Sequence, residues 1–585
     1  MDQHLLAVAL GTEPADLVIT NGQLVNVYSG ETYPGGVAVA GDRIAAVGDV
    51  AYTIGAGTTV IDAGGKYLTP GFIDGHIHPE SANLSLSRFA EVALSHGTTA
   101  VFTDLHEIGV VGGIEAMSAA LEEGKQTPLK FYWLVPSHIP FSPGVETSGG
   151  HIDAGIIEQA MARSDAHGLS EVVSVYVAMG LPDLMRSLDI TREQHKVISG
   201  HAPETHGPAW NAFVAAGATN DHEALSADEI VQRVRSGVNA QLRHNLVVPT
   251  MPALVPAVKS GIDTRMLSLA TDDTTAVVLA NEGHMDYLVR LVLEQGVPLV
   301  TAIQMATLNV AQAFHKDFEI GALAPGRYAD INIVDGPEQF RVLKTIAGGT
   351  LVAEDLRPVA PLPLAGHDPI LLNTFHLKRP VTAGDLVIPA RAGAKSAHVS
   401  IMRTLPWVPI TEGGEADLPV KDGYIAADTA QDLLHIAVIE RHHQTGNIGR
   451  AFLGGMGLKR GAMASSIGHD HHNIVALGTN PEDMAVAANR VAELQGGIVL
   501  VDGGRVIDEI PLPILGLLTD VDAWTLAKQR QALLAKAAEM GCAVSDAFMF
   551  LSFITLAAIP AFAITDKGYV DVIKQAIVDP VLSYR

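Results

Sequence analysis

The chain has 585 residues, more than one hydrophobic core supports, so two to four domains are expected. It carries 64 acidic against 38 basic residues, and the resulting net charge of −26 disfavours nucleic acid or an anionic membrane surface as a partner. A single cysteine, Cys542, excludes an intrachain disulfide framework and fits a reducing compartment, so a cytoplasmic protein is expected.

The N-terminal part of the chain predicts a small β-sheet unit. Residues 16–68 form short alternating apolar runs separated by Gly, Asn and Asp, and a similar texture returns at 319–355. A β unit whose halves lie so far apart in the sequence implies that another domain is inserted between them. We therefore predict a composite β-sandwich domain made of residues 1–68 and 319–360.

The inserted segment, residues 69–318, alternates short apolar runs with amphipathic helical patterns. Eight such alternations have the size and rhythm of a (β/α)8 barrel, with VVSVYVAM as the fourth strand. The fold class that we predict is therefore α/β, with a TIM-like barrel inserted in the small β domain.

Two further segments complete the chain. Residues 361–395 are rich in proline and glycine and predict a linker, and residues 396–585 predict a separate C-terminal α/β domain. Within that domain, residues 547–564 contain no charge over 18 residues, which reaches the lower limit for spanning a bilayer. Because Pro560 interrupts this stretch and no second candidate exists, we expect a buried core segment and no contact with a membrane.

Metal-ligand side chains recur where the predicted barrel strands end. His76 and His78 follow the first strand, and residues i and i+2 of a strand point to the same face. The other predicted strand ends carry, in chain order, His106 and Glu107, His201 and Glu204, His222 and Glu223, Arg243 and His244, and Asp272 and Asp273. One strand-end histidine is more often a structural residue, but this series predicts a divalent metal site with a position open for water.

The motif PGFIDGHIHPES, residues 70–81, resembles that of the adenine deaminase family within the amidohydrolase superfamily. The resemblance continues through DLHEI, GHAP, NDHE, ATDD and GHMDYLVR, and through the C-terminal GNIGRAFLGGMGLKRGAMASSIGHDHHN, a domain that generic amidohydrolases lack. It covers nearly the whole chain. It implies hydrolytic deamination of adenine or a related aminopurine, a manganese, iron or zinc cofactor, and a homodimer or larger homo-oligomer.

The fourth strand departs from the family pattern. The resemblance implies a glutamate there that bridges two metals, but the matching segment SVYVAMGLPD places Val177 at that position. The fifth strand instead offers Glu204 in HAPE, which resembles the mononuclear deaminases of the superfamily. We therefore expect one catalytic ion, with two ions, or Glu171 as a surrogate ligand, as alternatives. The expected ligands of the single ion are His76, His78, His201 and Asp272.

The resemblance also implies roles for individual residues. Asp272 would bind the metal and accept the water proton, Glu204 would protonate the ring nitrogen, and Asp273 would lie near the leaving amine. His222 would orient the water or bind a second metal. The residues expected to contact the substrate are His106, Glu107, Arg243, His469 and Asn473, although a structural role for the last two stays open.

Two other functions compete with deamination. A cyclic amidase would normally need a carbamylated lysine on the fourth strand, and no lysine is present in SVYVAMGLPD. A non-catalytic descendant of the enzyme is suggested by Val177 but is opposed by the retained histidines and aspartate.

Overall fold

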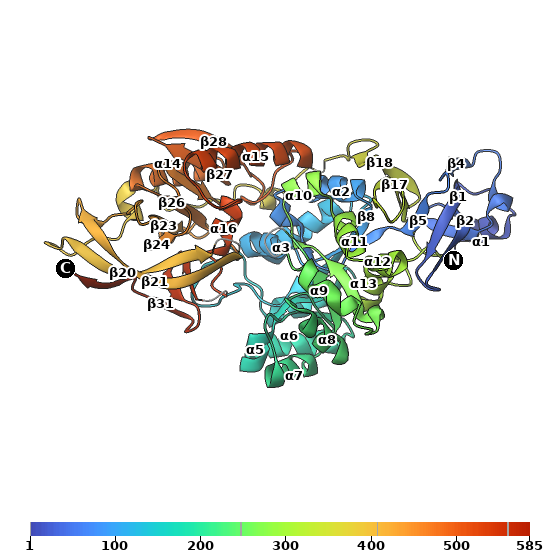
Figure 1. Cartoon of the computed structure of the whole chain (residues 1–585), viewed down its shortest axis with the longest axis horizontal. Helices are drawn as coiled ribbons and strands as arrows, with labels where there is room; N and C mark the ends of the chain where they lie inside the picture. The colour runs from blue at the N-terminus through green and yellow to red at the C-terminus, as the bar shows by residue number, and fades with distance from the viewer. Residues whose placement is uncertain (1, 246–248, 365, 406–407, 559–560) are drawn as a thin grey trace.

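The computed structural model describes residues 2–245, 249–364, 366–405, 408–558 and 561–585 (Figure 1). A small β domain lies at the N-terminal end of the long axis, a barrel lies at the centre, and the C-terminal domain lies at the other end. The polypeptide passes through the β domain twice.

The β domain is one nine-stranded sheet built from two distant segments. Its strand order is β19-β18-β17-β16-β5-β1-β2-β3, with β4 paired to β1. Antiparallel pairing of Pro70 in β5 with Ile331 in β16 joins the two segments into this one sheet. The strands are β1 (Leu17–Asn26), β2 (Glu31–Ala40), β3 (Arg43–Gly48), β4 (Thr59–Asp62), β5 (Tyr67–Pro70), β16 (Ile331–Val334), β17 (Val342–Ala347), β18 (Thr350–Glu354) and β19 (Arg357–Pro358), and helix α1 (Gln3–Leu10) precedes them.

The inserted domain is the predicted parallel barrel. Eight strands pair in chain order from β6 to β14. They are β6 (Phe72–Asp74), β8 (Thr98–Thr103), β9 (Lys130–Pro136), β10 (Ala166–Val173), β11 (Val197–His201), β12 (Asn220–Asp221), β13 (Asn239–Arg243) and β14 (Leu267–Ala270). Two short strands, β7 (Ile77–His78) and β15 (Asp272–Asp273), pair in parallel and close the barrel between its first and last strands.

Helices surround the barrel and follow its strands. Helix α8 shows why they form, since Ser226 and Glu229 make a reciprocal capping box at its N-terminus and Ile230 is buried. The helices are α2 (Leu86–Ser95), α3 (His106–Gly124), α4 (Ala154–Met161), α5 (Ser174–Met179), α6 (Pro182–Glu193), α7 (Gly207–Ala215), α8 (Ala227–Arg235), α9 (Met251–Val258), α10 (Ala276–Asn281), α11 (Met285–Glu294), α12 (Leu299–Met305) and α13 (Leu308–Ala313).

The fourth strand lies earlier than predicted. We expected VVSVYVAM, residues 172–179, to be the strand, but β10 ends at Val173 and residues 174–179 form helix α5. β-branched residues are a weak guide over so short a run, because packing decides between strand and helix. This shift changes which residue of the fourth strand reaches the barrel mouth.

The C-terminal domain is built on a ten-stranded sheet with helices α14 (Pro481–Glu493) and α15 (Ala523–Glu539) packed on it. The sheet strands are β20 (Ser396–Leu405), β21 (Val408–Lys421), β22 (Tyr424–Ile425), β23 (Leu433–Ile439), β24 (Ile448–Gly454), β25 (Ala462–Ser465), β26 (Ile474–Gly478), β27 (Gly497–Asp502), β28 (Arg505–Pro511) and β32 (Val581–Tyr584). A separate three-stranded sheet contains β29 (Phe562–Thr565), β30 (Gly568–Asp571) and β31 (Ala576–Val578).

The charge-free stretch in this domain is divided between helix α16 (Ala547–Phe553) and β29, and residues 547–552 are buried. Pro560, which we expected to interrupt the stretch, lies outside the described residues. Among the helices of the described part of the chain, none combines the length and the apolar character needed to cross a bilayer.

The C-terminal domain lies beside the barrel (Figure 1) and contacts the segment that follows its first strands. Arg530 of α15 donates to Asn83 Oδ1 at 3.0 Å, and Asn83 Nδ2 donates to the Leu517 carbonyl oxygen at 3.1 Å. In the predicted linker, His367 lies between Glu123 of α3 at 3.1 Å and Asp520 at 2.8 Å. Polar contacts therefore hold the C-terminal domain and the predicted linker against the barrel.

Candidate metal centre

The closing seam of the barrel brings the first ligand group together. β7 pairs with β15 so that Asp273 lies opposite His78, and the Asp272 amide donates to the His76 carbonyl oxygen at 2.9 Å. His76 Nε2 and His78 Nε2 lie 3.7 Å and 3.6 Å from Asp272 Oδ1. These three side chains are buried and present one ligand atom each to a common point.

Glu171 links this group to a second one. Its Oε1 lies 3.1 Å from His76 Nε2 and 3.7 Å from His222 Nε2, and its Oε2 lies 2.8 Å from His201 Nδ1. Burial alone would raise the pKa of Glu171, but His201 and His76 hold that pKa well below its usual range. Glu171 is therefore an ionised carboxylate between two sets of imidazoles.

A bulge at the end of β10 aims Glu171 at the centre. The register of β10 against β11 shifts between Leu169 and Val172, and Glu171 adopts a φ of 52°. Ser137, which follows β9, donates to the Glu171 carbonyl oxygen at 2.7 Å. Non-glycine residues with positive φ are uncommon and cluster at functional sites, and Asp272 is another with a φ of 61°.

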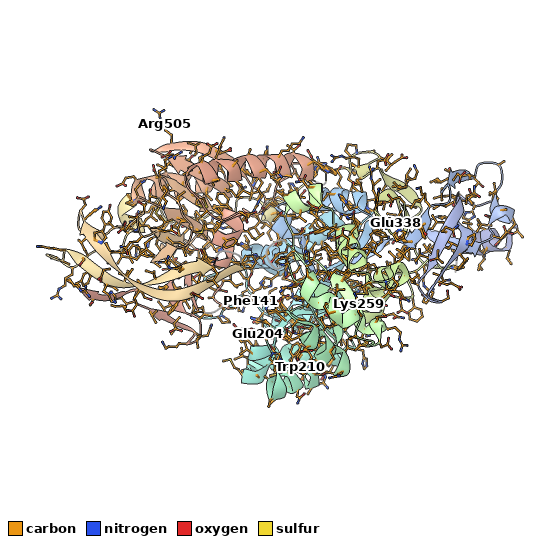
Figure 2. The ribbon with its side chains drawn as sticks, in the orientation of Figure 1. Phe141, Glu204, Trp210, Lys259, Glu338 and Arg505 are labelled. Atoms are coloured by element: carbon orange, nitrogen blue, oxygen red, sulfur yellow. The ribbon has the colours of Figure 1, made fainter. Side chains whose placement is uncertain are left out.

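Val177 and Glu204 do not lie where we expected them. Val177 is on α5 and packs in a hydrophobic cluster, whereas Glu171, on β10, lies between His76 and His201. Glu204 lies on the exposed loop after β11 and lines a surface hollow with His206 and Asp228 (Figure 2). β11 ends at His201, and among the described residues Glu204 makes no hydrogen bond or ion pair with the histidines and carboxylates of the centre.

The ligands that we expected to share one ion fall into two groups. His76, His78 and Asp272 form one, and His201 forms another with His222 and Glu223. The ring of His222 stacks on that of His76 with centroids 3.9 Å apart. The carboxylate of Glu171 lies close to members of both groups, because it faces His76 on one side and His201 and His222 on the other.

The side chains fit a bound metal. Both ring nitrogens of His76, Nδ1 of His201 and Oε1 of Glu171 are buried and make no hydrogen bond of acceptable geometry within the described residues. Buried polar atoms are normally hydrogen-bonded, so ligand-type atoms gathered here without one need another partner. Imidazole nitrogens with carboxylate oxygens are a donor set that binds divalent metals such as zinc, manganese or iron.

Further side chains orient these ligands. Asp104, at the end of the second strand, lies 3.1 Å from His78 Nδ1, which leaves Nε2 directed at Asp272. Arg243 contacts Glu223 Oε1 at 2.5 Å and Asp272 Oδ2 at 2.6 Å. Burial alone would raise the pKa of Asp272, but Arg243 and the nearby histidines lower it. Arg243 therefore binds two carboxylates of the centre, and the substrate contact that we expected of it stays a prediction.

The residues expected to bind substrate differ in whether their polar atoms have hydrogen-bond partners. His106 is buried, with both ring nitrogens lacking a hydrogen bond among the described residues, and its ring centroid lies 6.4 Å from that of His78. The Asn473 amide is used by backbone groups, since Nδ2 donates to the Thr147 carbonyl oxygen at 2.9 Å and Oδ1 accepts from the Arg441 amide at 3.1 Å. Asn473 therefore has the structural role that was left open.

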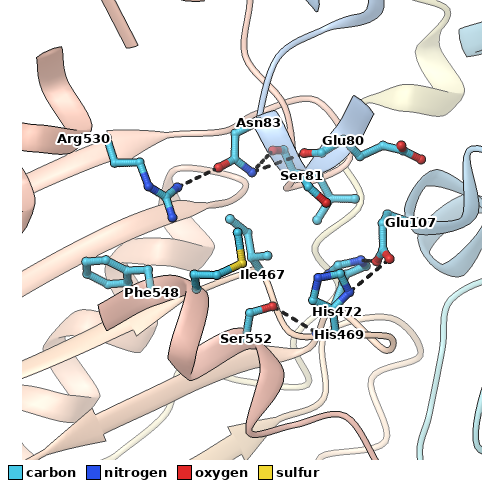
Figure 3. A pocket seen from close by; sticks show the side chains of 12 residues that line it. Glu80, Ser81, Asn83, Glu107, Ile467, His469, His472, Arg530, Phe548 and Ser552 are labelled. Carbon is cyan, nitrogen blue, oxygen red and sulfur yellow. Dashed lines mark hydrogen bonds and ion pairs between the residues drawn. The ribbon is translucent and has the colours of Figure 1, made fainter. Parts of the chain in front are cut away.

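Glu107 contacts two histidines of the C-terminal domain. Its carboxylate lies against His469, at 3.1 Å from Nδ1, and against His472 (Figure 3). A cavity of about 20 Å³, room for one water molecule, adjoins these residues. Glu80 and Ser81 line it from the barrel side, and Ser81 donates to Asp273.

Several functional candidates were missed from the sequence. Glu80 lies within PGFIDGHIHPES and Asp104 within DLHEI, both of them motifs that carry predicted site residues. Carboxylates beside strand-end histidines were the available signal. Glu171 was only an alternative ligand in our prediction, because the fourth strand was placed too late in the sequence.

An eight-stranded parallel barrel with histidines, a glutamate and an aspartate at its mouth defines a metal-dependent hydrolase of the amidohydrolase class. Residues 67–352 match the amidohydrolase family, and residues 409–576 match the adenine deaminase C-terminal domain. The adenine deaminase of Mesorhizobium japonicum is 38% identical over 98% of this chain and 96% of that protein.

Two further relatives match over the same length. Adenine deaminase 3 of Rhizobium meliloti is 38% identical over 97% of this chain and 96% of its own, and the adenine deaminase of Moorella thermoacetica is 36% identical over 99% and 97%. The chain belongs to the adenine deaminase family.

Proposed function

We propose that the chain hydrolyses adenine to hypoxanthine and ammonia by adding water to the ring carbon that bears the amino group. The observation that carries this proposal is the position of Glu171, 3.1 Å from His76 and 2.8 Å from His201, in a buried set of metal-type ligands. Full-length similarity to proteins named adenine deaminase supports the choice of base.

Two divalent ions suit this geometry better than the single ion that we first expected. His76, His78 and Asp272 would hold one, and His201 with His222 would hold the other. Glu171 would be shared, because its two oxygens face different histidines. The single-ion expectation rested on the absence of a bridging carboxylate, and Glu171 supplies one.

A divalent ion held there would lower the pKa of a water molecule to near neutrality and so make hydroxide available at neutral pH. Asp272 Oδ1 faces the same point as the histidine nitrogens and would accept the proton released from water. Arg243 occupies Asp272 Oδ2, which fixes the carboxylate so that Oδ1 remains directed at the centre. His106 would contact the base, because its buried ring nitrogens have no hydrogen bond within the described residues.

Glu80 would take the acid role that we first gave to Glu204. It is buried, its Oε2 has no hydrogen-bond partner in the described chain, and burial raises its pKa to about 8. Its carboxyl group therefore holds a proton at neutral pH, which a ring nitrogen of the base needs as water adds.

Replacing Glu80 by glutamine should lower kcat about 100- to 10,000-fold, because the amide keeps the shape of the side chain but is a far weaker acid. Steady-state kinetics with adenine would measure this, with Glu204→Gln as the matched control that keeps full activity. Equal kcat values for Glu80→Gln and the wild type would remove Glu80 from the reaction.

Ammonia release from a panel of aminopurines, aminopyrimidines and cyclic amides tests the function, with metal quantified on the same sample. We expect adenine to be turned over by protein that holds two ions per chain. Chelation should abolish turnover and added metal should restore it. Hydrolysis of cyclic amides alone, or turnover that survives complete metal removal, would contradict the proposal.

A further inference from the structure

Four polar side chains meet where the C-terminal domain covers the barrel mouth. This interdomain cluster consists of Glu107, His469, Asp470 and His472, all of them buried. Figure 3 shows Glu107, His469 and His472. Glu107 lies in the first turn of α3, whereas the other three belong to the loop between β25 and β26. Neither domain contains the cluster alone.

The hydrogen bonds of His472 determine where its proton lies. Its Nδ1 accepts from the Gly468 amide at 3.2 Å, so this nitrogen carries no proton. A neutral imidazole then has its N–H at Nε2, which faces Glu107 Oε2. His472 is therefore a donor that holds one oxygen of Glu107.

The other carboxylate oxygen of Glu107 contacts His469. Its Nδ1 lies 3.1 Å from Glu107 Oε1 and 2.9 Å from Asp470 Oδ1, and these two acceptors require an N–H at Nδ1. Ser552 Oγ accepts the His469 amide at 3.2 Å, and the ring of Phe553 packs on the imidazole with centroids 4.7 Å apart. The opposite nitrogen, Nε2, is thereby directed to Asp273, 3.9 Å away.

The charges around His469 favour the imidazolium ion. Burial alone would lower the pKa of His469, but Glu107, Asp273 and Asp470 together raise that pKa well above its ordinary value. Nε2 therefore carries a proton on the side that faces the reaction, in addition to the proton at Nδ1.

We propose that His469 donates a proton from Nε2 to the departing amine, and that Glu107 and Asp470 are positioning residues that orient its ring. This inference rests on the proposed function. After water adds, the ring carbon bears a hydroxyl and an amino group. The amino nitrogen takes the His469 proton, the C–N bond breaks with its electron pair on nitrogen, and ammonia leaves.

The remaining proton balances at His469. As the carbonyl forms, the hydroxyl proton passes to His469 Nε2, which has just lost its own proton, so the imidazolium is restored. No redox partner is needed.

His469→Asn separates proton donation from anchoring. The asparagine amide nitrogen corresponds in position to Nδ1 and can still donate to Glu107, but nothing replaces Nε2. We expect kcat for adenine to fall at least about 100-fold, with KM within about threefold, metal content unchanged and the melting temperature nearly unchanged. Glu107→Gln, which leaves the ring of His469 less well oriented, should show a smaller loss of kcat with the same unchanged KM.

Glu123→Gln is the matched control. Glu123 lies on the same helix, is buried, and likewise pairs with a histidine from outside the barrel, since His367 Nδ1 lies 3.1 Å away. This variant should lose thermal stability but keep kcat.

Three results would overturn the inference. Unchanged kcat in folded, metal-loaded His469→Asn protein would exclude His469 as the proton donor. A rise in KM alone would show that His469 is a binding residue. Loss of an ion from that variant would make His469 a ligand. Wild-type protein that releases no ammonia from adenine would instead overturn the proposed function and this inference with it.

Discussion

Glu171→Gln is expected to remove most of the bound metal and to lower kcat/KM for adenine at least about 1,000-fold. Glutamine keeps the size of the side chain but loses the negative charge that lies between His76 and His201. It also offers only one oxygen, so it cannot face both histidine groups as a ligand. Metal quantification after gel filtration and steady-state kinetics measure the two effects.

Val177→Ala is the control for this change, because Val177 is the residue that the sequence alone placed at the bridging position. It packs in a hydrophobic cluster away from the ligands, so the variant should lose some stability and keep its metal and kcat. If Glu171→Gln retained two ions and full activity, Glu171 would not be the shared carboxylate.

Asp272→Asn should cause a loss of comparable size, about 100- to 10,000-fold in kcat, through a different step. The amide keeps a ligand oxygen but cannot accept the proton that water releases. Because it also lacks the charge that pairs with Arg243 at 2.6 Å, the guanidinium is left with Glu223 as its ionised partner in this cluster. Kinetics with adenine, together with metal content, would detect the change.

Asp263→Asn is a suitable comparison, since Asp263 pairs only locally with Arg265 on an exposed loop. It should leave kcat unaltered. An Asp272→Asn enzyme with wild-type kcat would exclude Asp272 as the proton acceptor, whatever its part in holding metal.

The sequence predicted the barrel and its first ligands because both have local signals. His76 and His78 are two residues apart on a strand, and Asp272 follows a strand whose apolar residues are evident. Side-chain direction in a strand alternates with period two, so their common orientation follows from spacing alone. The composite β domain could be predicted for a similar reason, because both halves show strand patterning.

Glu171 and the interdomain cluster could not be predicted in this way. A bulge in β10 directs Glu171 at the centre. Because we placed that strand six residues too late, Val177 took the place of Glu171 in the prediction. Glu107 and His469 are separated by 362 residues and meet only because two domains pack together. No periodic pattern records such a contact, whereas Glu204, which does follow a barrel strand, turns out to face solvent.

The seam between β7 and β15 has one more consequence. The backbone pairing that closes the barrel joins Ile77 to Asp272 and His78 to Asp273. Because His78 and Asp272 are also expected metal ligands, metal binding and barrel closure are thermodynamically linked. Removing the metal would destabilise the barrel first at the β7–β15 pairing, where amide hydrogens would begin to exchange with solvent. Metal supply during synthesis would then govern how much of the chain survives proteolysis, as well as how much of it is active.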